Sequence, residues 1–154
     1  FLKIKEALDK NKIVYETYEH EPVITSEDAE RVRKAKLCEG VKAMVLKCKD
    51  KFVMVTLPAD KKIDLKKIKK QLSIDDIRLA TLEEVKEIID CERGGVPPFG
   101  FLFGIQTFAD KGIANNKEIE FNAGLTTKSI RMKAQDYFKV AEKFAEVTFG
   151  EFTR

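Results

Sequence analysis

The 154-residue sequence has no tryptophan, a single histidine and only three cysteines. Cys38, Cys48 and Cys91 lie far apart, so no pair has metal-binding spacing, and their odd number argues against a disulfide framework. A reducing, cytoplasmic setting is therefore expected. His20, in TYEHEP, has no second candidate ligand near it in sequence, so we expect neither a metal site nor another cofactor.

Long apolar runs are also missing. No run approaches the length of a membrane span, and FLKIKEALDK lacks the apolar core of a signal peptide. Because the chain begins at Phe1 rather than methionine, we expect a piece trimmed from a longer sequence. With 44% hydrophobic and 36% charged residues, the composition is that of a globular protein. No linker, repeat or low-complexity segment interrupts it, so residues 1–154 are expected to form one domain.

Neither sign of charge is in large excess, since the formal net charge is only +3. The distribution is more informative, because KKIDLKKIKK (61–70) holds six lysines. One interpretation is the solvated face of a helix. The other is a contact surface for a polyanion, in which lysines bind phosphates and release counterions.

Hydrophobic spacing predicts helices alternating with strands. A Thr81–Glu84 capping box marks one helix start, and the polar turn at 49–51 between two apolar segments predicts a hairpin of central strands. The expected helices are 1–11, 26–36, 64–72, one beginning after Thr81, and 134–144; the expected strands are 13–20, 41–48, 52–57, 101–110, 117–124, 126–132 and 145–152. Helices interleaved with hairpins indicate a mixed α/β (α+β) fold with a partly antiparallel sheet.

GGVPPFG (94–100) concentrates three of the eight glycines and two of the four prolines in seven positions. Glycine permits sharp bends and close approach of other atoms, and proline fixes φ and stiffens the chain before it. The segment is either a rigid connection between a helix and a strand, or a preorganised backbone beside Phe99 that holds the polar group of a small ligand.

Lys42 stands at the start of the apolar strand VKAMVL, where a buried lysine is rare without a partner. Either its ammonium reaches water at the strand end, or it points into a pocket, where it suits a phosphate or an oxyanion. No Ser or Cys lies in a nucleophile-elbow context. Any hydrolysis would therefore proceed by positioning and electrostatics, without a covalent intermediate.

Four segments, TYEHEP (17–22), VKAMVL (41–46), GGVPPFG (94–100) and EFNAG…SIRM (120–132), occur in the order and spacing of the YbaK-type tRNA-editing domain family. The sequence resembles this family along nearly its whole length. The resemblance implies a curved, mixed, largely antiparallel sheet surrounded by helices. It also implies an aminoacyl-tRNA deacylase that hydrolyses the ester of a wrongly charged tRNA, either free-standing or carried within a prolyl-tRNA synthetase.

The resemblance also implies roles for individual residues. Lys42 matches the essential lysine near the 3′-terminal adenosine and its phosphate, and Gly94 and Gly95 match the glycine loop around the aminoacyl group; these three are the predicted catalytic residues. The predicted substrate-binding residues come from the pocket edge, the rest of the glycine loop and the NAG segment, and they are Tyr18, His20, Val96, Pro98, Phe99, Gly100, Asn122 and Gly124. The 2′-hydroxyl of the adenosine is expected to assist proton transfer.

One departure concerns the amino acid removed. The family often has threonine after its lysine, whereas Ala43 follows Lys42 here, and Phe99 occupies a loop position that varies. Alanine, serine, threonine and cysteine therefore all stay open as the amino acid on the mischarged tRNA. Two alternatives also stay open: a tRNA-binding module without chemistry, and an editing domain excised from a larger aminoacyl-tRNA synthetase.

Overall fold

The structure, a computed structural model, describes residues 1–21, 37–89, 91 and 95–154. Its helices are α1 (Leu2–Lys10), η1 (Leu37–Glu39), α3 (Leu65–Leu72), α4 (Leu82–Ile88), η2 (Gly100–Phe103), η3 (Lys111–Asn115) and α5 (Ala134–Ala141), where η marks 3₁₀ geometry. Its strands are β1 (Tyr15–Glu19), β2 (Val41–Cys48), β3 (Lys51–Pro58), β4 (Ile77–Leu79), β5 (Gln106–Asp110), β6 (Glu118–Asn122), β7 (Lys128–Lys133) and β8 (Val147–Gly150). The predicted helix at 26–36 lies outside the described residues.

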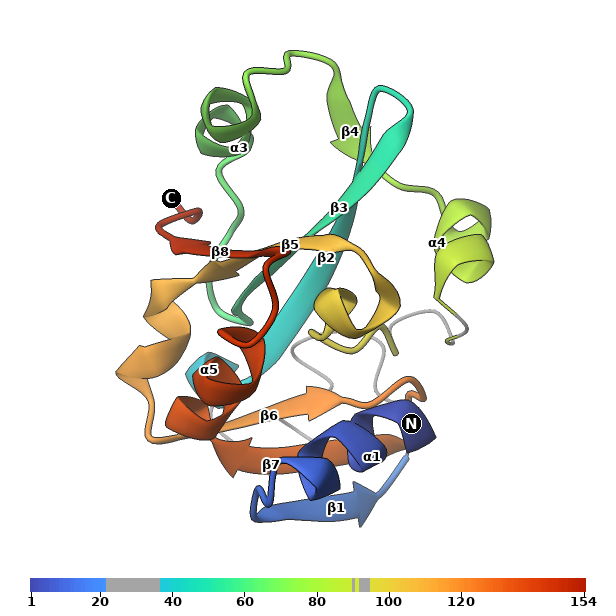
Figure 1. The fold of residues 1–154 in the computed structure, drawn as a ribbon, viewed down its shortest axis with the longest axis vertical. Helices are drawn as coiled ribbons and strands as arrows, with labels where there is room; N and C mark the ends of the chain where they lie inside the picture. Colours follow the sequence, from blue (N-terminus) through green and yellow to red (C-terminus); the bar gives the residue numbers. More distant parts are fainter. Residues whose placement is uncertain (22–36, 90, 92–94) are drawn as a thin grey trace.

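The described strands form two sheets (Figure 1). One is antiparallel, in the order β1-β7-β6, and the other is mixed, in the order β4-β2-β3-β5-β8, with β5 parallel to both of its neighbours. An isolated parallel bridge between Gly40 and Glu120 joins the sheets where β2 begins beside β6. The predicted mixed class is therefore confirmed, with the expected curved sheet divided at this junction.

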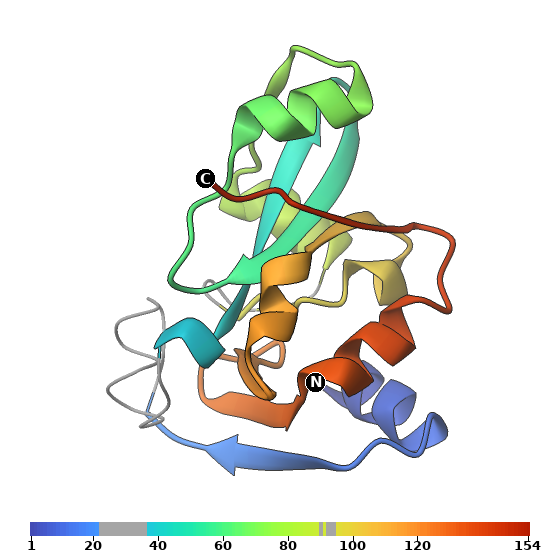
Figure 2. The ribbon, with the colours of Figure 1, turned by 90° about the vertical axis from the view of Figure 1, so that its left-hand side faces the viewer.

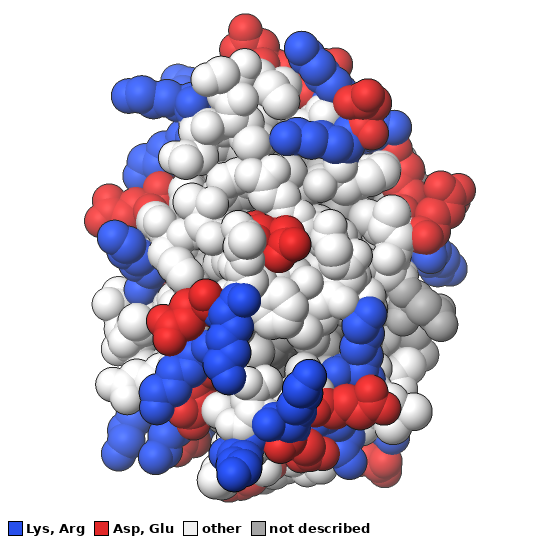
Figure 3. All heavy atoms as spheres, viewed as in Figure 1, with Lys and Arg blue, Asp and Glu red and all other residues white. Residues whose placement is uncertain are grey.

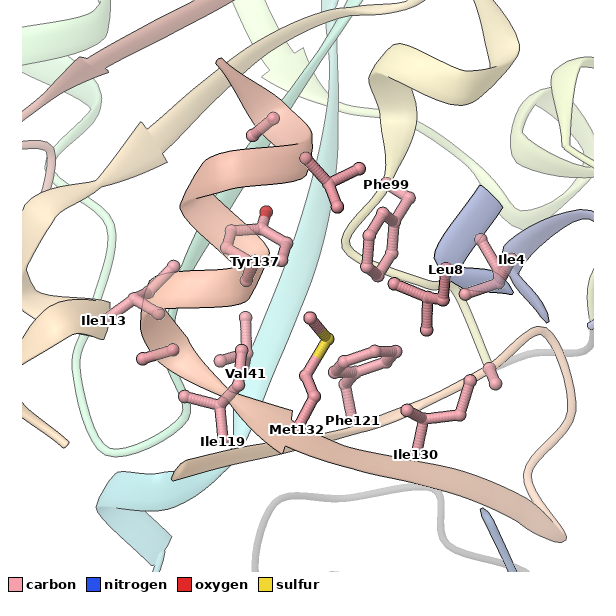
Figure 4. Packing of buried hydrophobic residues seen from close by; sticks show 14 of the residues in the cluster. Ile4, Leu8, Val41, Phe99, Ile113, Ile119, Phe121, Ile130, Met132 and Tyr137 are labelled. Carbon is pink, nitrogen blue, oxygen red and sulfur yellow. The ribbon is translucent and has the colours of Figure 1, made fainter. Parts of the chain in front are cut away.

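Helices α1 and α5 cover one face of the three-stranded sheet (Figures 1 and 2). Ile4 and Leu8 of α1, predicted to form its apolar side, are fully buried. They pack with Phe121 of β6 and Ile130 of β7 in the larger hydrophobic core (Figure 4). Because side chains alternate across a strand, this arrangement leaves the other face of the sheet to polar residues.

The hairpin and the capping box were predicted correctly. Strands β2 and β3 are both central and are joined at Lys49, whose φ is 58°. Thr81 caps α4 by accepting a hydrogen bond from the Glu84 amide at 3.2 Å, and the Glu84 carboxylate accepts one from the Thr81 amide at 2.8 Å. Arg78 adds an ion pair to the same carboxylate, which lowers the pKa of Glu84 well below its usual range.

The predicted strand at 101–110 begins later than expected. Residues Gly100–Phe103 form η2, which ends at Gly104 in the left-handed conformation with φ 74°, and β5 starts only at Gln106. The Ile105 amide donates to the Gly100 carbonyl, which closes this turn. Burial of Phe101 in the core overrides the β propensity of the segment.

The lysine-rich segment forms α3, with Ile68 buried and Asp64 capping its first turn. On the face shown in Figure 3, basic and acidic side chains are interspersed, and neither sign covers the surface alone. The solvated-face interpretation accounts for the helix. Contact between its lysines and a polyanion stays a prediction.

Candidate functional site

The described part of the GGVPPFG loop, residues 95–100, is anchored to the core by buried contacts. The Phe99 ring is fully buried, with its centroid 5.2 Å from that of Phe121 and 5.3 Å from that of Tyr137. The Tyr137 hydroxyl lies 2.7 Å from the Pro98 carbonyl oxygen and 3.0 Å from the Thr56 hydroxyl. Since a carbonyl can only accept, Tyr137 donates to Pro98 and Thr56 donates to Tyr137. These contacts hold Pro98 and Phe99 against the core.

The same anchoring indicates that two predicted site residues, Phe99 and Gly100, have structural roles. Phe99 belongs to the core, so we now expect its ring to hold the loop rather than to touch a ligand. A Cβ on Gly100 would lie 2.8 Å from the Thr107 hydroxyl and 3.0 Å from the Met54 sulfur, so only glycine fits there. Val96 is half-buried against the hydrophobic cluster around Val45.

Gly95 and Gly124 meet backbone to backbone. The Gly124 amide donates to the Gly95 carbonyl oxygen at 2.8 Å. A Cβ on Gly95 would lie 3.0 Å from both the carbonyl carbon and the oxygen of Gly124, and Gly124 itself has a φ of 96°. Both positions therefore require glycine, one for space and the other for conformation. We call this contact the glycine seam. It brings the loop at 95–100 against the turn that follows β6.

Lys42 lies beside the strand that leads into the glycine seam. Gly40 and Glu120 form an isolated parallel bridge, and Lys42 and Asn122 each lie two residues beyond it. Asn122 lies on the polar face of the three-stranded sheet, and Lys42 lies near the start of β2 in the five-stranded sheet. Asn122 is two residues before Gly124. The bridge and the glycine seam thus bring together the segments that carry Lys42, Asn122, Gly124 and Gly95, although these come from three separate sequence motifs.

His20 is connected to Asn122 through a residue that the sequence analysis did not single out. The His20 Nε2 atom lies 2.6 Å from the Ser129 hydroxyl oxygen, and the Ser129 hydroxyl lies 3.4 Å from Asn122 Oδ1. Ser129 is paired with Tyr18 on one side and with Asn122 on the other. The pleat of TTKSIRM already placed Ser129 opposite the apolar Ile130, but only the strand register shows which residues it joins.

Tyr18 lies at the outer edge of the same face, with its side chain 40% exposed. Its hydroxyl donates to the Glu16 carboxylate, and that hydrogen bond raises the pKa of Tyr18. The position suits a residue at the rim of a site.

Arg131 holds the junction between the sheets. Its guanidinium lies 2.8 Å from a Glu118 carboxylate oxygen and 3.1 Å from a Glu39 oxygen, and Glu120 lies 3.7 Å away. Glu39 is in η1, immediately before β2. The network therefore ties η1, which leads into β2, to β6 and β7.

Ala43, the departure from the family pattern, packs against the cluster of Val45 and Met54. Alternation along β2 puts it on the opposite face from Lys42. The hydroxyl that Ala43 lacks would therefore lie at this hydrophobic cluster, on the face of β2 opposite Lys42. Gly94, the remaining predicted catalytic residue, lies outside the described residues.

A cavity of about 500 Å³ lies elsewhere, and none of the predicted site residues lines it. Its walls come from the end of β3, η3 and the C-terminal segment, and include Lys61, Lys67, Asp110, Lys111 and Asn116. Within the described ranges, no group of three or more His, Cys, Asp and Glu side chains is placed to hold a metal ion. In the same part of the chain, no helix is long and apolar enough to span a membrane.

Comparison with known proteins shows to which family the chain belongs. A model of the aminoacyl-tRNA editing domain family matches residues 20–140. The chain belongs to this family. It is 34% identical over 128 residues to the multifunctional Ser/Thr-tRNA deacylase ProXp-y of Escherichia coli K12, which covers 80% of this chain and 77% of that protein.

Other matches cover different shares of the proteins compared. A proline–tRNA ligase of Bacillus cereus AH187 is 35% identical over 75 residues, which is 49% of this chain but 13% of the ligase. The crystal structure of a hypothetical protein, APE2540, superposes with a TM-score of 0.86 at 18% identity and 99% coverage of both chains. A protein proposed to be a trans-editing enzyme for prolyl tRNA synthetase gives 0.80, also at 18% identity, over 99% of this chain and 96% of that one. These two likenesses establish the fold.

The family and fold that the sequence motifs predicted are thus confirmed. So is the predicted activity, because the aminoacyl-tRNA editing domain is a hydrolase of mischarged tRNA. The roles predicted for individual residues stay predictions, and the grouping around the glycine seam is the geometry in which they can be tested.

The anchoring of the editing loop makes a prediction about stability. Replacing Tyr137 by phenylalanine leaves the Pro98 carbonyl without its buried donor, so the free energy of unfolding should fall by about 1–3 kcal/mol. Burial raises the pKa of Tyr137 far above its usual range, so the hydroxyl keeps its proton and the loss should not depend on pH near neutrality. Denaturant unfolding monitored by circular dichroism measures it.

Tyr15→Phe is the matched control. The Tyr15 hydroxyl donates to Asp9 at 2.8 Å in an exposed position, where the change should alter stability by less than about 0.5 kcal/mol. Equal stability losses in the two variants would contradict the anchoring role of Tyr137.

Proposed function

We propose that this editing domain acts in trans on tRNA mischarged with a small amino acid, with serine and threonine as the preferred esters, and that the site is the group of residues around the glycine seam. The observation that supports the proposal is the bridge between Gly40 and Glu120 together with the glycine seam, because they bring together the segments that carry Lys42, Asn122, Gly95 and Gly124. The likeness to the Escherichia coli deacylase supports the choice of amino acids.

The loop supplies a preorganised backbone for the reacting ester. Water attacks the aminoacyl carbonyl carbon, the carbonyl oxygen gains negative charge, and the bond to the ribose oxygen breaks to give a free amino acid and a tRNA 3′ end. The Gly95 N–H group is the donor that we assign to the developing oxyanion, because donors fixed before the reaction need no reorganisation. The Gly124 amide is already engaged with Gly95, so it holds the loop in place.

Lys42 provides the positive charge of the site. We assign its ammonium to the phosphate of the terminal adenosine, where it orients the ester beside the glycine seam. His20 and Tyr18 form the edge, and the adenosine 2′-hydroxyl takes part in proton transfer to the leaving oxygen. An aminoacyl ester is an activated bond, so positioning and electrostatics suffice without a covalent intermediate.

The domain organisation and the setting complete the proposal. We propose that residues 1–154 form one editing domain, and that it works in the cytoplasm, where charged tRNA is present. An aminoacyl-tRNA synthetase is a proposed partner, because a proline–tRNA ligase carries a related segment.

A panel of mischarged tRNAs tests the substrate. Alanyl, seryl, threonyl and cysteinyl esters are presented to the protein together with a correctly charged prolyl-tRNA, and the loss of each ester is followed against a reaction without protein. We expect the seryl and threonyl esters to decay fastest and the prolyl ester to survive.

The panel also separates catalysis from simple binding. Salt-dependent tRNA binding without ester loss above the rate in the absence of protein would overturn the enzyme and support a tRNA-binding module. Preferential loss of the alanyl or cysteinyl ester would keep the deacylase but contradict the assignment of serine and threonine.

A further inference from the structure

Ser129 occupies the centre of the polar face of the three-stranded sheet. It lies on the middle strand β7, it is fully buried, and its hydroxyl reaches a side chain on each neighbouring strand segment. His20 Nε2 is 2.6 Å away and Asn122 Oδ1 is 3.4 Å away. One hydroxyl thus joins two residues that the family resemblance places at the substrate.

The other nitrogen of His20 limits where the protons can be. Nδ1 lies 2.6 Å from the carbonyl oxygen of Glu21. A carbonyl accepts hydrogen bonds and donates none, so Nδ1 carries a proton. In the neutral imidazole, Nε2 is then the acceptor, and the donor within reach is the Ser129 hydroxyl.

The single proton of Ser129 also determines the orientation of Asn122. When that proton is donated to His20 Nε2, the Ser129 oxygen can only accept from Asn122. The Asn122 amide then turns its NH₂ group toward Ser129, since the two ends of an amide are interchanged by a flip. The Glu21 carbonyl thus sets the tautomer of His20, and the Ser129 hydroxyl, with its proton given to Nε2, limits how the Asn122 amide can face it.

We propose that Ser129 is a positioning residue of the editing site, whose hydroxyl donates to Nε2 of His20 and thereby holds the His20 ring and the side-chain amide of Asn122 in one arrangement. The proposal deepens the proposed function and rests on it for its kinetic consequence. The amide of Asn122 is thereby presented in one orientation to the adenosine or to the aminoacyl group, and His20 is held at one angle at the edge of the site.

The short His20–Ser129 contact also resembles the pairing of a base with a nucleophile. Ser129 is fully buried in the middle strand, however, and both sides of its hydroxyl are taken by side chains. An ester carbon cannot approach it without displacing one of them. The geometry therefore favours positioning over covalent catalysis.

His20 is the only histidine in the chain, which permits a direct spectroscopic test. In protein labelled with ¹⁵N at histidine, long-range ¹H–¹⁵N correlation spectra report the tautomer without an assignment problem. We expect the wild type at neutral pH to show the Nδ1–H tautomer, and Ser129→Ala to keep that tautomer but change the ¹⁵N shift of the unprotonated Nε2, which loses its hydrogen bond. Ser129→Thr, which keeps the hydroxyl, should retain the wild-type spectrum.

Kinetics on the same proteins give the second readout. Ser129→Ala should lower kcat for seryl-tRNA hydrolysis by about tenfold with little change in KM, because the geometry at the ester is disturbed rather than tRNA binding. Ser129→Thr should recover most of the rate. Thr17→Ala, an exposed hydroxyl on β1 of the same sheet, should leave both the rate and the histidine spectrum unchanged.

Three results would overturn the proposal. The first is an unchanged His20 spectrum in folded Ser129→Ala. The second is an equal loss of rate in the alanine and threonine variants, which would indicate packing alone. The third is complete loss of activity in Ser129→Ala with an acyl-enzyme burst in the wild type, which would make Ser129 the nucleophile. Since the spectra need no substrate, a wild type inactive toward every ester would refute the proposed function and leave the Nε2 signal of His20 decisive for Ser129.

Discussion

Replacing Lys42 by alanine should lower the rate of deacylation by about 10²–10³-fold, the loss that follows removal of one electrostatic donor from a preorganised site. The reason is that Lys42 lies two residues beyond the bridge that joins β2 to β6, and β6 leads into the glycine seam. Without the ammonium, the phosphate end of the adenosine loses its counter-charge and the ester is no longer held against the loop. Single-turnover hydrolysis of seryl-tRNA measures the effect.

Lys47 on the same strand supplies the matched control. Alternation places it on the other face of β2, where its ammonium lies 3.3 Å from a Glu84 carboxylate oxygen and 5.3 Å from the centroid of the Phe52 ring. Lys47→Ala removes the same charge from the same strand, so it should retain close to wild-type activity. Full activity in Lys42→Ala, or equal losses of activity in both variants, would contradict the role assigned to Lys42.

Gly95→Ala should reduce deacylation by about 10²-fold, the cost of moving a reacting group by roughly 1 Å. The added Cβ would lie 3.0 Å from the Gly124 carbonyl carbon and oxygen and 3.1 Å from the Leu125 amide nitrogen. These are backbone atoms that cannot turn aside, so the loop must shift as a whole. The hydrogen bond from the Gly124 amide to the Gly95 carbonyl is then lengthened, and the Gly95 N–H group moves away from the position that we assign to the oxyanion.

Gly104→Ala separates this effect from the general cost of losing a glycine. A Cβ at Gly104 meets nothing within 4 Å, but its φ of 74° strains an alanine, so the variant should lose about 1 kcal/mol of stability and keep its activity. The opposite pattern, in which Gly95→Ala edits normally while it remains folded, would show that the glycine seam does not border the ester.

Local signals in the sequence were sufficient for most of the helices and strands. The Thr81–Glu84 pattern predicted a capping box because both partners belong to one helical turn. The apolar character of β2 and β3 predicted central strands, because both of their faces are covered. The segment after Gly100 was mistaken for a strand, since the burial of its aromatic rings depends on core partners that are distant in sequence. Strand β4 is only three residues long and carries too little pattern to be predicted.

The candidate site could be predicted as a set of residues but not as a geometry. Family resemblance named Lys42, Gly95 and Gly124, whereas the meeting of the segments that carry them follows from the bridge between Gly40 and Glu120 and from the glycine seam. Pairing between strands is a long-range property that no local spacing encodes. The same reason explains why Ser129 was missed, because its importance lies in the partners that the register gives it.

A structure of the protein with a non-hydrolysable seryl-adenosine, in which an amide replaces the ester, tests the central claim most directly. The account predicts that the seryl carbonyl oxygen lies within hydrogen-bonding distance of the Gly95 amide, with the adenosine beside Lys42 and Asn122. An analogue bound instead in the cavity of about 500 Å³ between Lys61, Lys111 and Asn116, with the glycine seam empty, would contradict it.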